Sequence, residues 1–448
     1  MPGLAWDIPV SDDFQNKLDA AYEQYRADVA KLQQGARADA AAIWTDDFTF
    51  PDAEARHEEL RNMLDRYAER ANVLGQRYYD TVRTLTEQEY GILLPPQGPI
   101  DAASSDRLIW QLAGGSNHTD YPGLHLPDVI PDADGNVHND YGLRLEDLFP
   151  KSDNLNDWLG YIDRWCMSGT RMGIENCVSN DTSNPRWARV PKGKTCEFCI
   201  MLASRGYVYW NKETASLGGS FHDGACDCAV VPSWVASKIR GYDPEQLRQR
   251  WQACADTVAG LTTKEGYASY VQAFVADGRH SEPLSYDHWK RNIELAEARW
   301  RDRTWLNGGP EPPITFATEK LREETERARP QEIRTAQRLR KHGIIPAFQI
   351  DSRPVINPDT GIEESVGLPD WAGGGEIKTP DKAKAFRSID GYLGSAAKKE
   401  DCKRLIIDNT ENPNMSDDTL IEYIHQSNRF KRGMIYILDK KQSLLRIR

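Results

Sequence analysis

Residues 369–378 read Pro-Asp-Trp-Ala-Gly-Gly-Gly-Glu-Ile-Lys, which places two carboxylates and an amine around a run of three glycines. Asp370 ends one predicted strand, the glycines permit a tight reversal, and Glu376 and Lys378 alternate on the next strand. Side chains two positions apart on a strand point to the same face, so Glu376 and Lys378 project together, with Asp370 brought across from the paired strand. The stretch therefore predicts that three charged groups converge at one point of a small sheet.

These three groups match the chemistry of phosphodiester hydrolysis. Two carboxylates can hold a divalent cation such as Mg²⁺, which neutralises the charge that develops on phosphorus, and a lysine can orient or deprotonate water. We expect Asp370 and Glu376 to be the Mg²⁺ ligands and Lys378 to be the water-activating group. The alternative is an ordinary exposed hairpin that carries a salt bridge.

A fourth acid lies on the charged helix that precedes this stretch. Glu332, Ala336 and Leu339 share one helical face at spacings of four and three. If that face packs on the sheet, Glu332 is drawn toward the site as an auxiliary ligand or base. A solvent-exposed position for Glu332 is the alternative, because the whole segment is densely charged.

The surrounding segments alternate between helix and strand, the order of a small mixed sheet flanked by helices. Thr379 is the predicted N-cap of one helix, with Pro380 in its first turn. The other predicted helices and strands are helices at 318–342 and 416–428 and strands at 347–350, 367–371, 376–379, 404–408, 434–438 and 444–447.

A concentration of helix breakers separates this module from the rest of the chain. Residues 307–313 read Asn-Gly-Gly-Pro-Glu-Pro-Pro, the composition of a semi-rigid linker. We therefore predict a multidomain protein with a region at 1–306, a linker at 307–315 and a domain at 316–448. The balance of charge also changes along the chain. Residues 331–448 hold 20 Lys and Arg against 17 Asp and Glu, whereas residues 1–330 hold 36 against 51.

The first region is predicted to be mainly α-helical. Apolar residues recur with helical spacing over 14–32 and 60–85, and three more helical patterns follow at 243–259, 263–277 and 285–303. The first two helices are either core helices of an ordinary bundle or a rod used in assembly. The chain shows neither an apolar run long enough to span a membrane nor a secretory signal at its start, so we expect no membrane span.

Five potential metal ligands gather in a short loop of this region. The loop contains a CxxC pair and then an HxxxCxC pattern. Zinc prefers four thiolate or imidazole ligands, so four of the five would suffice to fold the loop around a structural Zn²⁺. Disulfides formed in an extracellular particle and plain buried thiols are the alternatives. The candidate ligands are Cys196, Cys199, His222, Cys226 and Cys228.

The run from Val190 to Pro232, with its CxxC, Phe-His pair, CxC and closing Val-Val-Pro, resembles the signature of phage minor head proteins of the Mu F-like group. That resemblance implies a helical front half, a place in head assembly near the portal, and portal and capsid proteins as partners. It also implies synthesis in a bacterial cytoplasm and a final location in the virion. The spacing from His222 to Cys226 is one residue longer than the family pattern.

The C-terminal module resembles the PD-(D/E)xK nuclease superfamily, and more closely the toxin domains of contact-dependent inhibition proteins that act as transfer-RNA nucleases. The matching positions are Glu332, Asp370, Glu376 and Lys378. The resemblance implies a restriction-endonuclease-like α/β fold, tRNA as substrate, action in a target-cell cytoplasm and an immunity protein as a further partner. A DNase and a non-catalytic binding module are the alternatives.

Basic residues that are candidates for contact with a phosphate backbone surround this predicted site. Each of them, taken singly, is equally well explained as part of a solvated helix face. They are Lys382, Lys384, Arg387, Lys398, Lys399, Arg429, Lys431 and Arg432.

Overall fold

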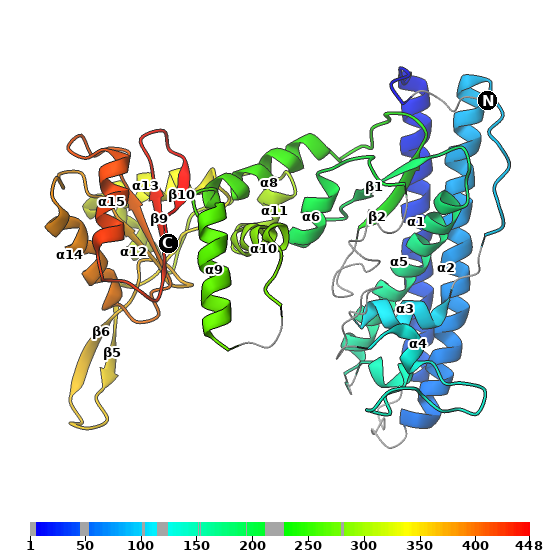
Figure 1. Ribbon diagram of the computed structural model, residues 1–448, viewed down its shortest axis with the longest axis horizontal. Coiled ribbons are helices and arrows are strands. Elements are labelled where there is room, and N and C mark those ends of the chain that lie inside the picture. The colour runs from blue at the N-terminus through cyan, green and yellow to red at the C-terminus, as the bar shows by residue number, and fades with distance from the viewer. Residues whose placement is uncertain are drawn as a thin grey trace. The chain divides into compact units, whose positions relative to one another are not determined.

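The computed structural model divides the chain into two compact units, Met1–Arg248 and Gln249–Arg448 (Figure 1). Each unit is described separately below. The structure describes residues 6–44, 53–100, 104–113, 124–150, 152, 154–193, 195–210, 228–278 and 282–448.

Three long helices form the body of the first unit: α1 (Asp12–Ile43), α2 (Ala53–Tyr90) and α5 (Leu155–Ser179). Each of the three packs against the other two. Ser11 caps α1 by accepting a hydrogen bond from the Phe14 N–H at 3.1 Å. The helices predicted over 14–32 and 60–85 are confirmed, and both are longer than their apolar stripes indicate. In the first unit they serve as core helices, since α5 covers the stripe of both.

Glycine allows α2 and α5 to approach closely at their crossing. A Cβ on Gly75 would lie 2.2 Å from the Thr170 carbonyl oxygen, and one on Gly173 would lie 2.4 Å from the Asn72 carbonyl oxygen. Both distances are far below a normal contact, so a hydrogen atom is the largest substituent that either position accepts. The two glycines therefore set the distance between these helices.

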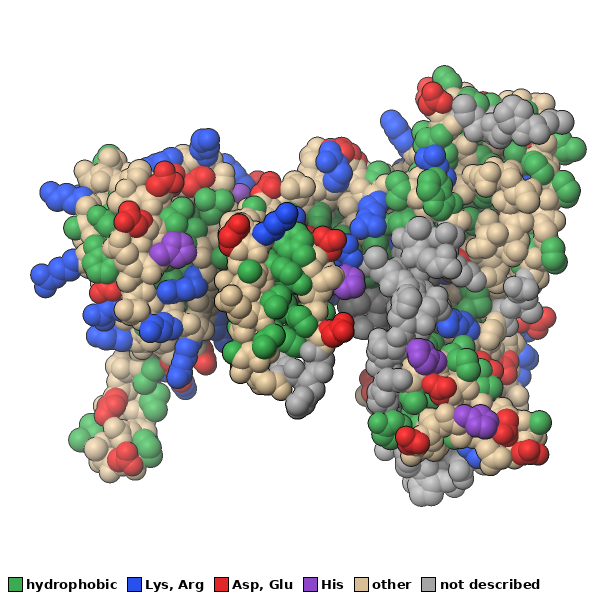
Figure 2. All heavy atoms as spheres, viewed as in Figure 1, with side chains coloured by type: hydrophobic (Ala, Val, Ile, Leu, Met, Phe, Trp, Pro, Cys, Tyr) green, Lys and Arg blue, Asp and Glu red, His purple; other side chains and the backbone are tan. Residues whose placement is uncertain are grey.

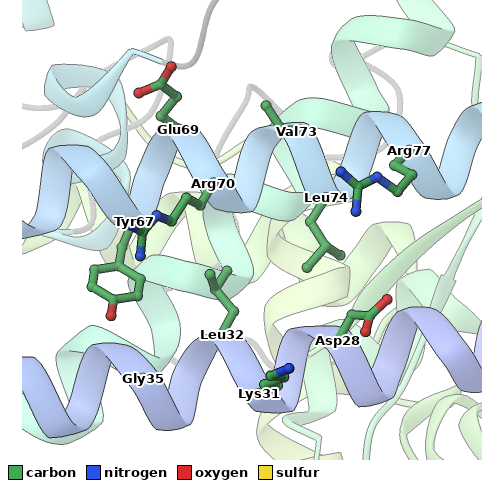
Figure 3. Close-up of a pocket in the computed structure, with 10 residues that line it drawn as sticks. All are labelled: Asp28, Lys31, Leu32, Gly35, Tyr67, Glu69, Arg70, Val73, Leu74 and Arg77. Atoms are coloured by element: carbon green, nitrogen blue, oxygen red, sulfur yellow. The ribbon is translucent and has the colours of Figure 1, made fainter.

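A groove of about 660 Å³ runs between α1 and α2 (Figure 3). Its floor includes Leu32 and Leu74, and charged side chains from both helices stand along its rim. The charges are of both signs: Lys31, Arg70 and Arg77 with Asp28 and Glu69.

Short elements complete the first unit, and among them α3 and β2 pack against α2 and α5. Strand β1 pairs with β2 in antiparallel fashion, with Ala188 opposite Val231. The described residues of the loop-rich stretch 93–155 form short helices. The elements are α3 (Ser105–Leu112), α4 (Leu126–Val129), η2 (Leu145–Leu148), β1 (Arg186–Val190), α6 (Glu197–Ala203) and β2 (Ala229–Ser233).

The second unit contains a four-stranded sheet in the order β10-β9-β8-β7. Strands β7, β8 and β9 are parallel, and β10 pairs antiparallel with β9. The central strands β8 and β9 read as nearly continuous apolar runs because helices cover both faces of the sheet. The bounds are β7 (Gly375–Lys378), β8 (Arg404–Asp408), β9 (Met434–Leu438) and β10 (Leu444–Arg446).

Alternate residues of the strands enter two different cores. Leu405 and Ile407 of β8 pack with helices α14 (Phe386–Ala397) and α15 (Asp417–Gln426). Ile406, between them, packs with α12 (Glu319–Ala328) and α13 (Pro330–Arg340) on the opposite face. The two-residue period of the strand therefore produces a three-layer α/β sandwich.

Further helices precede this sandwich and belong to the same unit. Glu297 and Arg301 of this helical segment are buried and lie 3.1 Å apart, and Glu297 accepts a hydrogen bond of 2.9 Å from the hydroxyl of Tyr436 on β9. The helices confirm the patterns at 243–259, 263–277 and 285–303. They are α8 (Pro244–Val258), which begins in the first unit, α9 (Lys264–Ala276), α10 (Tyr286–Arg299) and α11 (Arg303–Leu306).

The boundary between the compact units therefore differs from the sequence-based linker. It falls between Arg248 and Gln249, whereas 307–315 lies within the second unit. The Gly309 N–H donates to the Thr304 carbonyl at 2.8 Å, and β3 (Thr315–Phe316) pairs with β4 (Ala347–Phe348). A stretch rich in Gly and Pro is here an ordered connection between packed elements.

Local predictions in the second unit need four corrections. In the strand predicted at 367–371, residues 368–370 are irregular and Trp371 makes only isolated bridges. Helix 318–342 is two helices, because Pro330 begins α13 and Arg329 before it leaves the helical region with ψ 50°. The helix predicted to start after Thr379 starts at Phe386, with Ala385 as N-cap. Residues 352–367 form an unpredicted hairpin of β5 (Ser352–Ile356) and β6 (Glu363–Gly367), which projects from the sandwich in Figure 1.

None of the described helices is both long enough and apolar enough to cross a membrane.

Candidate functional site

Asp370 and Glu376 lie side by side at the edge of the sheet, as the sequence predicts. The Asp370 N–H donates to Glu376 Oε2 at 3.2 Å, and the Ile377 N–H donates to Asp370 Oδ2 at 2.7 Å. Strand β7 ends the described sheet, so the N–H groups on its outer side need acceptors other than a neighbouring strand. The Asp370 carboxylate supplies one, and this fixes its position next to Glu376.

The strand pairing that brings the two acids together differs from the predicted hairpin. Asp370 lies in a loop, and β7 pairs with β8 in parallel, with Glu376 opposite Leu405. Only Trp371 and Gly375 form a bridge across the turn. Gly373 and Gly374 adopt φ values of 90° and 84°, which favour glycine, and so permit the reversal.

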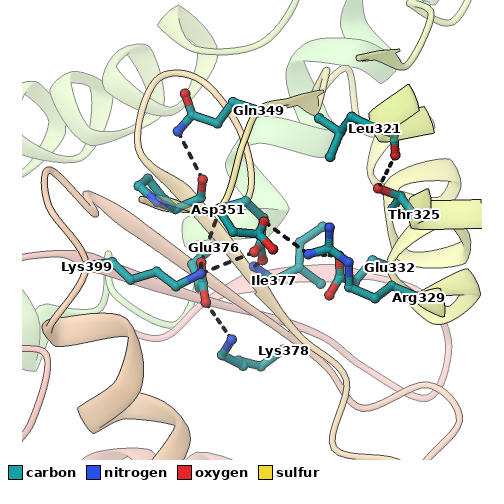
Figure 4. Close-up of polar contacts among 12 residues, drawn as sticks. Leu321, Thr325, Arg329, Glu332, Gln349, Asp351, Glu376, Ile377, Lys378 and Lys399 are labelled. Atoms are coloured by element: carbon teal, nitrogen blue, oxygen red, sulfur yellow. Dashed lines mark hydrogen bonds and ion pairs between the residues drawn. The ribbon is translucent and has the colours of Figure 1, made fainter. Parts of the chain in front are cut away.

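Two lysines hold the oxygens of these buried acids (Figure 4). Lys378 Nζ lies 2.5 Å from Glu376 Oε1. Lys399 Nζ lies 2.8 Å from Glu376 Oε2 and 3.4 Å from Asp370 Oδ1. Glu376 is 0% and Asp370 4% exposed, so these ammonium groups provide charge compensation that water does not. Burial and the neighbouring Glu376 charge raise the pKa of Asp370.

The sequence did not identify Lys399 as a member of the site. It predicted Lys399 only as one of the residues that could contact the phosphate backbone of a nucleic acid. Lys399 follows α14, whose C-cap is Lys398. The contact of Lys399 with Asp370 and Glu376 depends on the length and direction of α14. The sequence pattern does not predict these two properties. Burial disfavours the Lys399 ammonium, but the charges of Asp370 and Glu376 outweigh that effect, and the pKa of Lys399 is raised.

Glu332 also reaches the site, from the first turn of α13. Its side chain is 13% exposed and lies 3.5 Å from Arg329 through Oε2. Arg329 also contacts Asp351 at 3.2 Å. Burial, followed by the negative charge of Asp370, raises the pKa of Glu332 to about 7. Among the described residues, Glu332 Oε2 is a buried oxygen without a hydrogen-bond donor. The predicted exposed alternative for Glu332 is therefore wrong.

The predicted phosphate-contacting residues occupy different environments. On the face seen in Figure 2, Lys and Arg side chains gather over the part of the second unit that holds α14 and α15. Arg429 is engaged by Asp390 at 2.8 Å, and Lys399 belongs to the carboxylate cluster. The others are exposed: Lys382, Lys384, Arg387, Lys398, Lys431 and Arg432.

Three of the five predicted zinc ligands lie among the described residues. Cys196 is the N-cap of α6 and accepts the Cys199 N–H at 3.5 Å, while Cys199 Sγ accepts a hydrogen bond of 3.9 Å from buried Arg189. Cys228 is buried next to β2. His222 and Cys226 lie outside the described residues. In the described part of the chain, no three His, Cys, Asp or Glu side chains are grouped to hold a metal ion.

Comparisons with known proteins bear on the first unit. A profile of the VG15 protein family, a viral and phage-type family, matches residues 128–254. The matched range includes the whole cysteine cluster. Searches of the curated proteins and of the solved structures each give no match. The chain is thus similar, over residues 128–254, to a family of phage-type proteins.

Proposed function

We propose that the second unit is a metal-dependent nuclease and that the first unit belongs to a phage or prophage minor head protein that carries it. The observation that supports the nuclease is the burial of Asp370 and Glu376 between two lysines, with a third acid nearby. A surface salt bridge would leave such groups in water. Burying two acids next to each other is costly, and sites that bind cations and phosphates are where such an arrangement is useful.

The residues present fit a Mg²⁺ ion. Mg²⁺ is usually held by one or two carboxylates, with water and substrate oxygens supplying the remaining ligands. Asp370 and Glu376 would hold the ion, and Glu332, whose Oε2 lies 3.5 Å from Arg329, is the third acid near them. Two carboxylates are therefore sufficient for Mg²⁺. Among the described residues, no three His, Cys, Asp or Glu side chains are placed to hold one metal ion together. When bound, the ion would neutralise negative charge that develops on the phosphate.

Residues of this chain would supply the other two catalytic functions, which are proton transfer from water and contact with the substrate phosphate. Glu332, with a pKa of about 7, is suited to accept a proton from the attacking water near neutral pH. The Lys378 side chain, which contacts Glu376, is 21% exposed. Its ammonium can therefore donate to a substrate phosphate oxygen and orient the water. Two backbone hydrogen bonds, from the Asp370 N–H to Glu376 and from the Ile377 N–H to Asp370, fix the positions of both carboxylates.

We propose tRNA as the substrate of this unit. The exposed lysines and arginines near α14 supply positive charge for a phosphate backbone but do not distinguish RNA from DNA. The choice of tRNA rests on the resemblance of residues 330–448 to the nuclease toxins of contact-dependent inhibition. In that setting the unit would act in the cytoplasm of a target cell and would be neutralised by an immunity protein.

For the first unit we propose a structural role in the phage head, in contact with portal or capsid proteins. The match of residues 128–254 to a phage-type family supports this role. We also propose that Cys196, Cys199 and Cys228, with His222 or Cys226, bind a structural Zn²⁺. The metal would serve to fold the loop that these residues flank.

The nuclease proposal is tested with the full-length chain, total tRNA and Mg²⁺. We expect cleavage by the wild type and a loss of at least about a hundredfold in the Lys378→Met variant, because an ammonium that stabilises the transition state is worth that much. The Lys320→Met variant removes an exposed lysine of α12 that is not among the predicted phosphate contacts, and it should retain nearly full activity.

Absence of tRNA cleavage by the wild type, or equal rates for Lys378→Met and Lys320→Met, would contradict the proposal. Plasmid DNA and linear duplex DNA are assayed in parallel. Cleavage of DNA alone would retain the nuclease and replace its substrate.

A further inference from the structure

We propose that Lys399 is a built-in counter-cation that competes with the divalent cation for the carboxylate site. Its ammonium occupies the space between Asp370 and Glu376, and it must leave for a divalent cation to bind both acids. This inference rests on the proposed metal-dependent function and concerns how occupancy of that site is controlled.

Lys399 is the lysine whose contacts coincide with those of a bridging cation. Its Nζ lies 2.8 Å from Glu376 Oε2 and 3.4 Å from Asp370 Oδ1 (Figure 4). Lys378 contacts the other Glu376 oxygen, Oε1, and the described contacts of Asp370 do not include it. A divalent cation that bridges the two acids therefore meets Lys399, whereas Lys378 can keep its position.

The charges of the cluster also require an exchange. Asp370 and Glu376 together carry two negative charges, and Lys378 and Lys399 carry two positive ones. Adding a divalent cation while both lysines stay would place four positive charges against the two negative charges of these buried carboxylates. Departure of Lys399 halves that excess and opens the two oxygens that it covers.

The lysine can leave without disturbing the backbone that carries it. Glu400, the next residue, is fixed by its N–H to the Gly367 carbonyl at 2.9 Å and by a fork of hydrogen bonds from Arg353. The Lys399 side chain is 19% exposed, so the ammonium has access to solvent. A long flexible side chain on an anchored backbone can rotate outward and remain close to an incoming phosphate.

The first test measures cation binding directly. Isothermal titration calorimetry with MgCl₂ and with MnCl₂, at constant ionic strength, compares the full-length wild type with Lys399→Met and Lys398→Met. Methionine keeps the aliphatic bulk of lysine and removes its charge. We expect Lys399→Met to bind the cations about tenfold more tightly or better, as expected when a competing ion pair is removed. Lys398 is the exposed neighbour, and its variant should bind as the wild type does.

Equal or weaker cation binding by Lys399→Met relative to Lys398→Met overturns the proposal, as does an absence of binding by all three proteins. If Lys399→Met does not fold, as judged by circular dichroism, the wild type alone still decides. Amine acetylation followed by mass spectrometry should then show faster modification of Lys399 in MgCl₂ than in EDTA. The rate at Lys398 should not change. Unchanged or slower modification of Lys399 in MgCl₂ contradicts the exchange.

These outcomes are separable from the nuclease activity. Tighter cation binding by Lys399→Met, without any cleavage of nucleic acid by the wild type, would sustain the counter-cation and reject the nuclease. Cleavage that depends on Lys378, together with unchanged cation binding in Lys399→Met, would sustain the nuclease and reject the counter-cation.

Discussion

At the scale of single residues, two backbone N–H groups set the distance between Asp370 and Glu376. Each carboxylate accepts a hydrogen bond from the segment that carries the other, so neither can move independently. The sequence predicted that Glu376 and Lys378 project together because alternation along one strand is a local property. Asp370 joins them as predicted, but from a loop and not from a paired strand. It did not predict Lys399, whose position depends on the packing of an entire helix.

Glu332 makes the stability of the second unit depend on pH. Its pKa is raised from 4.5 to about 7, so the folded unit holds a proton that the unfolded chain releases. This contribution is fully present below about pH 4.5 and is lost as the pH rises through 7. Relative to Glu332→Gln, the wild type should therefore lose up to roughly 3 kcal/mol between pH 4.5 and pH 8.

Hydrogen exchange of the β8 amides as a function of urea, at pH 5 and pH 8, measures this difference within the full-length chain. Glu323→Gln, at an exposed position on α12, is the control and should follow the wild type. A pH dependence shared by Glu332→Gln and the wild type would show that Glu332 does not hold the proton.

At the scale of elements, the first unit depends on how closely α2 and α5 approach. A methyl group at position 173 would lie 2.4 Å from a backbone oxygen, which cannot rotate away as a side chain can. We expect Gly173→Ala to destabilise the first unit by about 1–3 kcal/mol, the usual cost of overpacking. Differential scanning calorimetry should show the corresponding transition several degrees lower.

Gly160→Ala is the matched control on the same helix. The nearest atom to a Cβ at that position is the end of the Arg164 side chain at 3.8 Å, so the methyl group fits. Alanine should stabilise the helix there by about 0.5–1 kcal/mol through its better helical propensity. A lower transition temperature in both variants would show that the close crossing is not the cause.

Helices with a clear apolar period and the apolar strands β8 and β9 were predicted correctly, whereas the start of α14 was not. The stripes of α1 and α2 give their positions because 3.6-residue periodicity is local. The predicted start of α14 was too early because Thr379 and Pro380 form a good capping sequence. In the structure, these residues form a turn in which the Asp381 N–H donates to the Thr379 carbonyl. Both choices satisfy local rules, and the packing of Ile389 and Leu393 decides between them.

At the scale of the whole molecule, composition indicated a boundary at 307–315, while the compact units divide at 248. Gly and Pro content reflects the local conformation of the backbone. It does not predict the tertiary contacts between the segments before and after it. The deciding contacts are buried ones, such as the Tyr436 hydroxyl on Glu297 and the Arg301 guanidinium on the His342 carbonyl at 2.5 Å. Neither pair is visible in the sequence, because the partners are far apart along the chain.

This division predicts different behaviour for two C-terminal fragments. A fragment of residues 249–448 should unfold cooperatively in urea. A fragment of residues 316–448 lacks Glu297, the acceptor of the Tyr436 hydroxyl, and also lacks Trp300, which packs against the core that contains Tyr436. Its free energy of unfolding should be lower by at least about 2 kcal/mol. Equal stability of the two fragments would place the boundary at the Gly and Pro segment after all.

The turn between the two acids also contains an optical probe. The indole of Trp371 lies where a side chain on Gly375 would stand, 1.8 Å from that absent Cβ at its nearest atom, and the ring is only 4% exposed. It is attached to the residue after Asp370 and rests on the residue before Glu376. The fluorescence of Trp371, isolated by subtracting the emission of a Trp371→Phe variant, should therefore change when the ions around these carboxylates exchange. Stopped-flow mixing with Mg²⁺ would then give the rate of that exchange in real time.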